Sequence, residues 1–270
     1  MERSSWAQQG IDLERPSVAR VYDYFLGGAH NFAVDRQLAE AITGITPAFG
    51  DTMRAHRAFL RRVVRFLMDA GVTQFLDIGS GIPTVGNVHE IARRTDPSAR
   101  VVYVDIDPIA VSHSRVILAG DPRTAVIQAD ARDTDRILED PETSQVLDLD
   151  RPVAVLLVGV LDYVPDTHDP VGIVRRLRDA VCPGSYLALV NATHESQPAD
   201  VVEAQKLLGR TGTPIYLRSR SELLDQFAGL TLLEPGLVHL PLWRPDSPLD
   251  VDGHPERFGA LAGLGRKDEG

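Results

Sequence analysis

The stretch TQFLDIGSGIPTVGNVHEIARRTDPSARVVYVDIDP at residues 73–108 decides the fold of this chain. It begins with a short apolar run that carries Asp77 near its end, and Gly79-Ser80-Gly81 then breaks that run. Helical spacing follows at residues 85–94, before a second apolar run that closes with Asp105. A strand–helix–strand unit of about 30 residues that opens with Gly-x-Gly is typical of a nucleotide-binding site.

Strands and helices alternate around this unit. Three helices are expected before it and strands alternate with helices after it, which predicts a doubly wound α/β sheet. The expected helices lie at 17–25, 31–43, 51–70, 109–118, 133–138, 169–181, 198–208 and 219–227, and the further strands at 124–128, 152–160, 185–190, 230–233 and 237–242. The last two strands are too close for a crossover helix, so we expect them to pair antiparallel at the edge of a Rossmann-like, seven-stranded sheet.

The same pattern divides the chain into three parts. We expect an N-terminal helical cap at 1–70, a Rossmann-like domain at 71–245 and a C-terminal tail at 246–270. The polar stretch at 141–151 predicts a loop, and the residues from 244 on, rich in Pro, Asp and Gly, also predict mostly loop. A ligand is expected outside the carboxyl ends of the strands, beside the first strand.

The composition limits the classes of partner. A net charge of −10 argues against nucleic acid and against an anionic membrane, because both require basic surface. We interpret the neighbouring Arg57, Arg61, Arg62 and Arg65 as a solvated helix face. The single cysteine, Cys182, excludes an internal disulfide and a cysteine-based zinc site, and no metal is expected. The chain starts without a signal-like apolar stretch and is expected in the cytoplasm, and its oligomeric state is left open.

The acidic residues at the strand ends indicate which nucleotide is bound. The third glycine of the dinucleotide fingerprint is replaced by Thr84, and Asp77 stands two residues before Gly79. A carboxylate there would repel a pyrophosphate but suits a cationic ligand. S-adenosylmethionine carries an ammonium and a sulfonium and no phosphate. Asp77, Asp105 and Asp130 therefore favour S-adenosylmethionine over NAD, although an aspartate at such a position can also serve as a helix cap or turn residue.

Several motifs resemble known methyltransferases. FLDIGSGIP, VVYVDIDP, VIQADARD and PVAVLLVGVLDYVPD resemble the successive motifs of class I S-adenosylmethionine-dependent methyltransferases, over about residues 72–242. ARVYDYFLGGAHNFAVDR (19–36), GIPTVGNVHEIA (81–92) and LLEPGLVHLPLWRP (232–245) resemble a bacterial family described generically as S-adenosyl methyltransferases. This second resemblance spans almost the whole chain.

The resemblance implies a set of residues that bind the cofactor. The turn of Gly79, Ser80 and Gly81 would let the backbone approach the methionine and ribose parts, and Asp77 would face the ammonium. Asp105, with Asp107 as an alternative, would accept hydrogen bonds from the ribose hydroxyls.

Further implied contacts lie at the adenine and at the methyl group. Asp130 would accept a hydrogen bond from the adenine amino group, and the Ala131 backbone N–H would donate one to a ring nitrogen. Ile106 would pack on the adenine face. Val158 and Gly159 would line the side on which the methyl group is transferred.

Methyl transfer itself needs little acid–base chemistry. It is an in-line displacement that releases a neutral thioether, so the enzyme mainly supplies proximity and alignment. A base is needed only for a protonated nucleophile such as a phenol or an alcohol. The weak candidates for that role are His194, Asp162, Tyr163 and His30, and no catalytic residue is assigned.

The N-terminal segment is expected to close over the site. Tyr22 lies in the densest cluster of aromatic, small and polar residues, and we expect this segment to cover the methionine end of the cofactor and to form part of an acceptor pocket. A small-molecule acceptor is favoured. A non-catalytic S-adenosylmethionine-binding regulator and an NAD-dependent oxidoreductase remain the alternatives.

Overall fold

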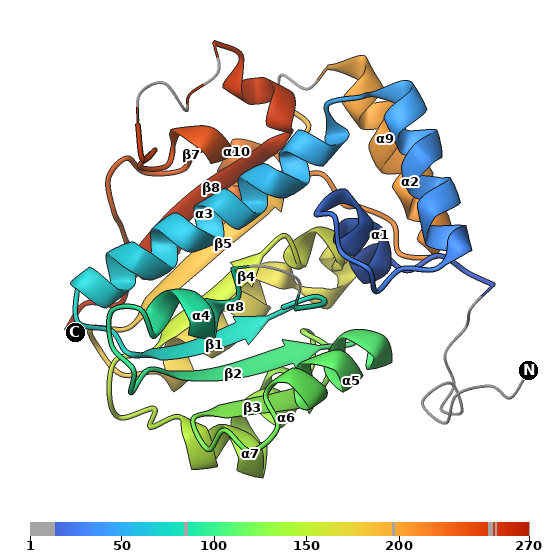
Figure 1. Ribbon diagram of the computed structural model, residues 1–270. Coiled ribbons are helices and arrows are strands. Elements are labelled where there is room, and N and C mark those ends of the chain that lie inside the picture. Colours follow the sequence, from blue (N-terminus) through green and yellow to red (C-terminus); the bar gives the residue numbers. More distant parts are fainter. Residues whose placement is uncertain (1–13, 84–85, 196–197, 248–250, 252, 270) are drawn as a thin grey trace, which may run out of the picture.

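In the part of the chain that the structure describes, the strands form one eight-stranded sheet in the order β3-β2-β1-β4-β5-β8-β6, with β7 also paired to β8. The computed structural model describes residues 14–83, 86–195, 198–247, 251 and 253–269, and is shown in Figure 1. The five parallel strands are β1 (Gln74–Ile78), β2 (Arg100–Asp105), β3 (Thr124–Gln128), β4 (Ala154–Val158) and β5 (Tyr186–Ala192). The predicted α/β class, a Rossmann-like sheet with an antiparallel last strand, is confirmed, but the described residues form eight strands instead of the predicted seven, because β8 was not expected.

Helices cover both faces of this sheet, which explains why its central strands are almost wholly apolar. One face packs against α3, α4 and α5, and the other against α6, α7, α8 and α10. Their bounds are α3 (Phe49–Asp69), α4 (Val88–Ala92), α5 (Pro108–Ile117), α6 (Thr134–Glu139), α7 (Pro141–Val146), α8 (Pro170–Ala180) and α10 (Arg220–Asp225). Helix α4 is shorter than expected, and the predicted Thr84 and Val85 lie outside the described residues.

The C-terminal strands differ from the expectation. The predicted hairpin is wrong, because β6 (Thr231–Leu232) and β7 (Val238–His239) each pair antiparallel with β8 (Ala260–Arg266). The predicted loop after residue 244 is wrong for β8, which also pairs along the whole of β5.

Two glycines explain why β8 does not resemble a strand in the sequence. Glycine is depleted from strands, yet β8 contains Gly263 and Gly265. A Cβ at Gly263 would lie 2.8 Å from the Phe227 ring, and one at Gly265 would lie 2.9 Å from Leu230. The glycines are required because the segment after α10 packs directly on this strand.

Helix α7 replaces the loop predicted at 141–151. The Asp140 side chain caps it by accepting from the Glu142 N–H, and Pro141 occupies the first turn. Both are ordinary signals of a helix start. The helix is short, so its polar composition outweighed those signals in the prediction.

The N-terminal helices lie at the carboxyl ends of the strands. Helix α1 (Val18–Phe25) and helix α2 (Ala33–Ile45) pack with α9 (Ala199–Leu208), as Figure 1 shows for α2 and α9. Their shared apolar cluster is separate from the two sheet clusters and includes Val21, Leu38, Ile42, Phe49, Ala204 and Leu208. Among the described helices, none is both long enough and apolar enough to cross a membrane.

Candidate active site

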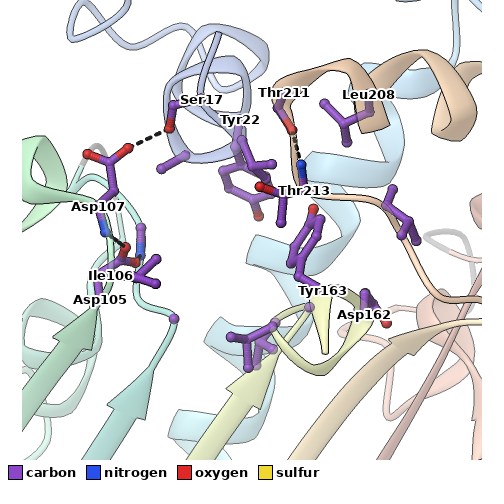
Figure 2. Close-up of a pocket in the computed structure, with 18 of the residues that line it drawn as sticks. Ser17, Tyr22, Asp105, Ile106, Asp107, Asp162, Tyr163, Leu208, Thr211 and Thr213 are labelled. Atoms are coloured by element: carbon purple, nitrogen blue, oxygen red, sulfur yellow. Dashed lines mark hydrogen bonds between the residues drawn. The ribbon is translucent and has the colours of Figure 1, made fainter. Parts of the chain in front are cut away.

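A cavity of about 760 Å³ opens at the carboxyl ends of β1, β2, β3 and β4, beneath α1, α3 and α9. Its size is that of a small-molecule site, about 300–1,000 Å³. We call the part formed by the strand ends the strand-end half; it contains Asp77, Gly79–Gly81, Asp105–Pro108 and Ala129–Arg132. We call the other part the helix half; it contains Tyr22, Met53, His56, Asp162, Tyr163, Leu208 and residues 211–216. Figure 2 shows Asp105 to Asp107 on one side and Tyr22, Tyr163 and Leu208 on the other.

The glycine turn after β1 is tied to the end of β2. The carboxylate of Asp105 accepts from the Gly81 N–H at 2.7 Å and from the Asp107 N–H at 2.8 Å. Burial nevertheless raises the pKa of Asp105 to about 6. Gly79 has φ +74°, and a Cβ there would lie 2.6 Å from Val160, so only glycine fits this turn. The Asp105 carboxylate and the close approach of Val160 therefore fix the main chain of the turn.

Asp77 is a buried carboxylate at the end of β1. No described residue donates a hydrogen bond to it, and burial raises its pKa to about 7, against the opposing charge of Arg57. Arg57 is also incompletely paired, because its Nε is buried and without a hydrogen-bond partner among the described residues. Buried charged groups are costly unless they are paired, so both groups suit a ligand that carries both signs of charge.

The far end of the strand-end half combines an exposed apolar side chain with an ion pair. Ile106 is 61% exposed at the cavity wall, and Ala131 also lines it. The two oxygens of Asp130 accept from Arg132 at 2.9 and 2.5 Å, and these hydrogen bonds lower the pKa of Asp130. Asp130 therefore lines the cavity with both of its carboxylate oxygens already hydrogen-bonded to Arg132.

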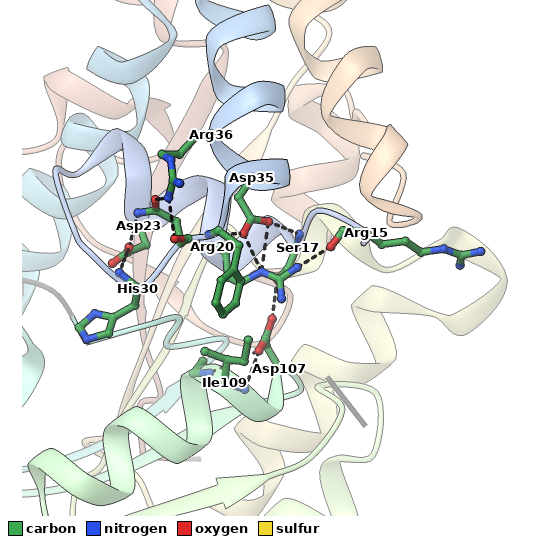
Figure 3. Close-up of polar contacts among 12 residues, drawn as sticks. Arg15, Ser17, Arg20, Asp23, His30, Asp35, Arg36, Asp107 and Ile109 are labelled. Carbon is green, nitrogen blue, oxygen red and sulfur yellow. Dashed lines mark hydrogen bonds and ion pairs between the residues drawn. The ribbon is translucent and has the colours of Figure 1, made fainter. Parts of the chain in front are cut away.

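Asp107 acts as a helix cap and as the point where α1 is attached. Its Oδ1 accepts from the Ile109 N–H at 2.7 Å, and its Oδ2 accepts from the Ser17 hydroxyl at 2.5 Å. The Ser17 N–H donates to Asp35, which forms a buried ion pair with Arg20. Figure 3 shows this network joining the start of α1 to the start of α5. It holds the N-terminal segment over the strand ends.

His56 on α3 is the histidine that lines the helix half. Its Nδ1 lies 2.8 Å from the Thr52 carbonyl oxygen, so Nδ1 carries the proton and Nε2 a lone pair. Burial lowers the pKa of His56. Gly159 follows β4 with φ +72°, and a Cβ there would lie 3.5 Å from the His56 Nε2 and 3.9 Å from the Asp162 Oδ2. Both groups therefore face the end of β4.

Asp162 and Tyr163 belong to the 3-10 helix η2 (Leu161–Tyr163), and both line the cavity. Asp162 accepts from the Ala192 N–H at 2.7 Å, and burial raises its pKa to about 7. Burial also raises the pKa of Tyr163, so its hydroxyl stays protonated. Tyr22 donates its hydroxyl to the Met53 carbonyl at 3.1 Å.

Two sequence candidates lie elsewhere. His194 is exposed after β5 and does not line the cavity. The His30 ring lies 4.0 Å from that of His113, outside the cavity lining. The other predicted residues, namely Tyr22, Asp77, Gly79, Ser80, Gly81, Asp105, Ile106, Asp107, Asp130, Ala131, Val158, Gly159, Asp162 and Tyr163, all line it.

Sequence reasoning missed His56 and misread Arg57. Of the four arginines interpreted as a solvated face, Arg61 and Arg65 are exposed and pair with Asp246. Arg62 is half-buried and donates to the carbonyls of Leu240 and Trp243. Arg57 lines the cavity, as its neighbour His56 does. The helix was predicted, but the face of it that the cavity would use depends on elements distant in the chain.

The chain is similar to known proteins over almost its whole length. A family model described as S-adenosyl methyltransferase matches residues 4–268. A DUF574 family protein from Streptomyces avermitilis is 41% identical, with 95% of this chain and 99% of that chain covered and a TM-score of 0.90. A putative methyltransferase from Thermobifida fusca is 42% identical, with 98% and 100% covered and a TM-score of 0.91.

More distant similarity reports only on the fold. Human N-acetylserotonin methyltransferase, solved in complex with S-adenosylmethionine, is 14% identical over 94% of this chain and 63% of that chain, with a TM-score of 0.51. No curated protein matches the chain.

Proposed function

The chain belongs to the S-adenosyl methyltransferase family, and we propose that its cavity transfers the methyl group of S-adenosylmethionine to a small-molecule acceptor in the helix half. The protein is an S-adenosylmethionine-dependent methyltransferase. The bound cofactor supplies a methyl group on a sulfonium, which is an electrophile. The residues of this chain bind and align the two reactants.

The pair of Asp77 and Arg57 carries the assignment of the cofactor's amino-acid end. That end has an ammonium and a carboxylate, and the cavity offers one buried carboxylate without a hydrogen-bond donor among the described residues and one guanidinium with an unpaired Nε. Asp77 would hold the ammonium and Arg57 the carboxylate through charge-assisted hydrogen bonds. A pyrophosphate in their place would meet two buried carboxylates, Asp77 and Asp105, which disfavours NAD.

The remaining strand-end residues suit the nucleoside. The Asp105 carboxylate, held by hydrogen bonds from the Gly81 and Asp107 N–H groups, would accept hydrogen bonds from the ribose hydroxyls. Ile106 offers an apolar face to the adenine, and Asp130 and Ala131 lie at its edge. Asp107 is assigned to capping and to holding Ser17, so we do not assign it to the ribose.

The acceptor is assigned to the helix half because that half is lined by aromatic and apolar side chains. Tyr22, Met53, Tyr163 and Leu208 surround it, beneath α1 and α9. Val158 and Gly159, at the end of β4, lie between the two halves. A net charge of −10 further disfavours a nucleic-acid acceptor.

Calorimetric titration tests the assignment. S-adenosylhomocysteine is compared with 5′-methylthioadenosine, which lacks the amino-acid end. Asp77→Asn and Arg57→Met are each expected to weaken the affinity for S-adenosylhomocysteine by about 10- to 100-fold, since a hydrogen bond to a charged group contributes about 1.5–3 kcal/mol. Both variants should bind 5′-methylthioadenosine as the unmodified protein does.

Arg61→Met is the matched control, because Arg61 lies on the same helix but pairs with Asp246 outside the cavity. It should leave both affinities unchanged. Binding of NAD without binding of S-adenosylhomocysteine would refute the proposed function. An equal loss of affinity for S-adenosylhomocysteine and for 5′-methylthioadenosine would contradict the assignment of Asp77 and Arg57 to the amino-acid end of the cofactor.

A further inference from the structure

We propose that the acceptor is a phenol and that Nε2 of His56 takes the proton of its hydroxyl group during methyl transfer. This inference rests on the proposed methyltransferase function and adds the chemical class of the acceptor. It starts from a side chain that the cofactor assignment leaves without a role, on a helix outside the Rossmann-like sheet.

The imidazole of His56 is held in one orientation. The Nδ1–H of His56 donates to the Thr52 carbonyl one turn earlier on α3, which leaves the lone pair on Nε2. No described residue forms a hydrogen bond with Nε2, and the side chain lines the cavity. An oriented imidazole with a free Nε2 is the arrangement of a general base.

The lone pair on the His56 Nε2 lies close to the end of β4. Nε2 lies beside Gly159, the residue that follows β4 at the border between the two halves. A side chain on Gly159 would meet the His56 ring at 3.3 Å, so glycine keeps this approach open. The His56 lone pair and the end of β4 therefore lie close together in the cavity wall.

The groups around His56 favour a neutral imidazole. The charged and titratable groups on the elements packed around His56 are Arg57 on α3, Tyr22 on α1, Asp77 on β1, and Asp162 and Tyr163 on η2. Burial together with the charge of Arg57 keeps the imidazole neutral at pH 7. Tyr163 is protonated and can donate but not accept a proton, and one oxygen of Asp162 is engaged by the Ala192 N–H.

The basicity of a neutral imidazole selects among nucleophiles. A phenol has a pKa of about 10, close enough for transfer to a histidine, whereas an alkyl alcohol is far less acidic. An amine needs no base once it is neutral. The aromatic wall of Tyr22, Tyr163 and Phe49 favours a planar ring in this half.

The reaction balances with these groups alone. The phenol oxygen forms a bond to the methyl carbon, and the carbon–sulfur bond breaks with its electron pair left on sulfur. The phenolic proton moves to Nε2 of His56. The products are an aryl methyl ether, S-adenosylhomocysteine and an imidazolium, which then releases its proton to solvent.

The test uses a panel of monocyclic and bicyclic phenols, including 1-naphthol and 4-nitrophenol, with matched anilines and benzylic alcohols. S-adenosylmethionine is supplied and S-adenosylhomocysteine formation is measured. We expect turnover of phenols. His56→Asn keeps a donor for the Thr52 carbonyl and should lower kcat for 1-naphthol by roughly 100-fold at pH 7, the scale of a lost general base.

The pH profile separates a base from a structural residue. The loss in His56→Asn should shrink as pH rises toward the pKa of the phenol, and it should be small for 4-nitrophenol, which ionises near neutral pH. His194→Asn, outside the cavity, is the matched control and should leave turnover unchanged. Nitrogen NMR of the unmodified protein should show His56 protonated at Nδ1 and titrating below about 6.5.

Several outcomes would overturn the proposal. They are turnover of anilines or benzylic alcohols without phenols, no turnover of any phenol by protein that binds S-adenosylhomocysteine, an equal loss for both phenols in His56→Asn, and a proton on Nε2. Failure of the unmodified protein to bind S-adenosylhomocysteine would contradict the proposed function instead.

Discussion

The two halves of the cavity are held in place in different ways. In the strand-end half, the hydrogen bonds that fix Asp105 come from the main chain of Gly81 and Asp107, within the βαβ unit itself. In the helix half, Tyr22, His56 and Leu208 come from three separate helices, and α1, α2 and α9 are joined through an apolar cluster of their own. The strand-end half is thus a property of local backbone geometry, whereas the helix half is a property of tertiary packing.

This difference fits the proposed roles of the two halves. The cofactor, which is the same in every turnover, would be bound by a turn that tolerates little change, since Gly79 has no room for a side chain. The acceptor would be bound by side chains on helices, where substitutions reshape the wall without altering the backbone.

Ile42→Ala should separate the helix half from the strand-end half. Ile42 is fully buried in the cluster of α1, α2 and α9, and such a truncation lowers the free energy of unfolding by about 3 kcal/mol. We expect increased hydrogen exchange in α1 and α2, and little change in 5′-methylthioadenosine affinity, both measured on the same preparation. Ile117→Ala, at a half-exposed position on α5, is the control. Equal loss of exchange protection in β1 would mean that the halves unfold together.

Gly79→Ala should damage the strand-end half through its backbone. The substitution combines positive φ with a contact to Val160, whereas Gly81 has positive φ but open space around it. We expect Gly79→Ala to lower the free energy of unfolding by about 2 kcal/mol more than Gly81→Ala, measured by urea denaturation. Similar values for the two variants would show that the close approach to Val160 is relaxed at little cost.

Asp77→Asn should stabilise the ligand-free protein at high pH. Burial raises the pKa of Asp77 from 3.8 to about 7, so the folded protein binds the proton of this side chain more tightly than the unfolded chain does. The resulting contribution to stability is fully present below pH 3.8 and is lost as pH rises through 7. Asparagine removes that loss, so we expect a gain of about 1.5 kcal/mol at pH 8 and little change near pH 4. Denaturation at both pH values, without ligand, measures it. A variant less stable at pH 8 would contradict the raised pKa.

Ser17→Ala should weaken the link between the halves. It removes the hydrogen bond from the Ser17 hydroxyl to Asp107, which joins α1 to α5. We expect a loss of about 1 kcal/mol in the free energy of unfolding, with a few-fold weaker affinity for S-adenosylhomocysteine. Thermal denaturation and calorimetry are the measurements, and Ser112→Ala, exposed on α5, is the control. Unchanged stability would mean that the Asp35 contact alone holds α1.

The strand-end half carries local signals in the sequence, because an apolar run, an acidic residue and a glycine break are adjacent in the chain. The cofactor residues that the family resemblance implies all line the cavity, and their contacts with the cofactor stay a prediction. Asp107 shows the limit of such reasoning, since the same residue type also caps helices, and here it caps α5.

The helix half could not be predicted in the same way. His56 and Arg57 lie among the charged residues of α3, and periodicity identifies only the apolar face of that helix. The elements that enclose its polar face, α1 and η2, come from distant parts of the chain. Strand β8 was missed for a related reason, because its glycines reflect the packing of Phe227 and Leu230 against it.

The position of β8 also has a consequence for the order in which the protein assembles during synthesis. Strand β8 follows every other strand in the chain, yet it supplies the only described strand partner of β6 and of β7, and it covers the edge of β5. Until the ribosome has delivered β8, β5 presents an apolar open edge, which is a template for pairing with other nascent chains. The half of the sheet built around β1 is complete before that point, so aggregation during translation should begin at β5.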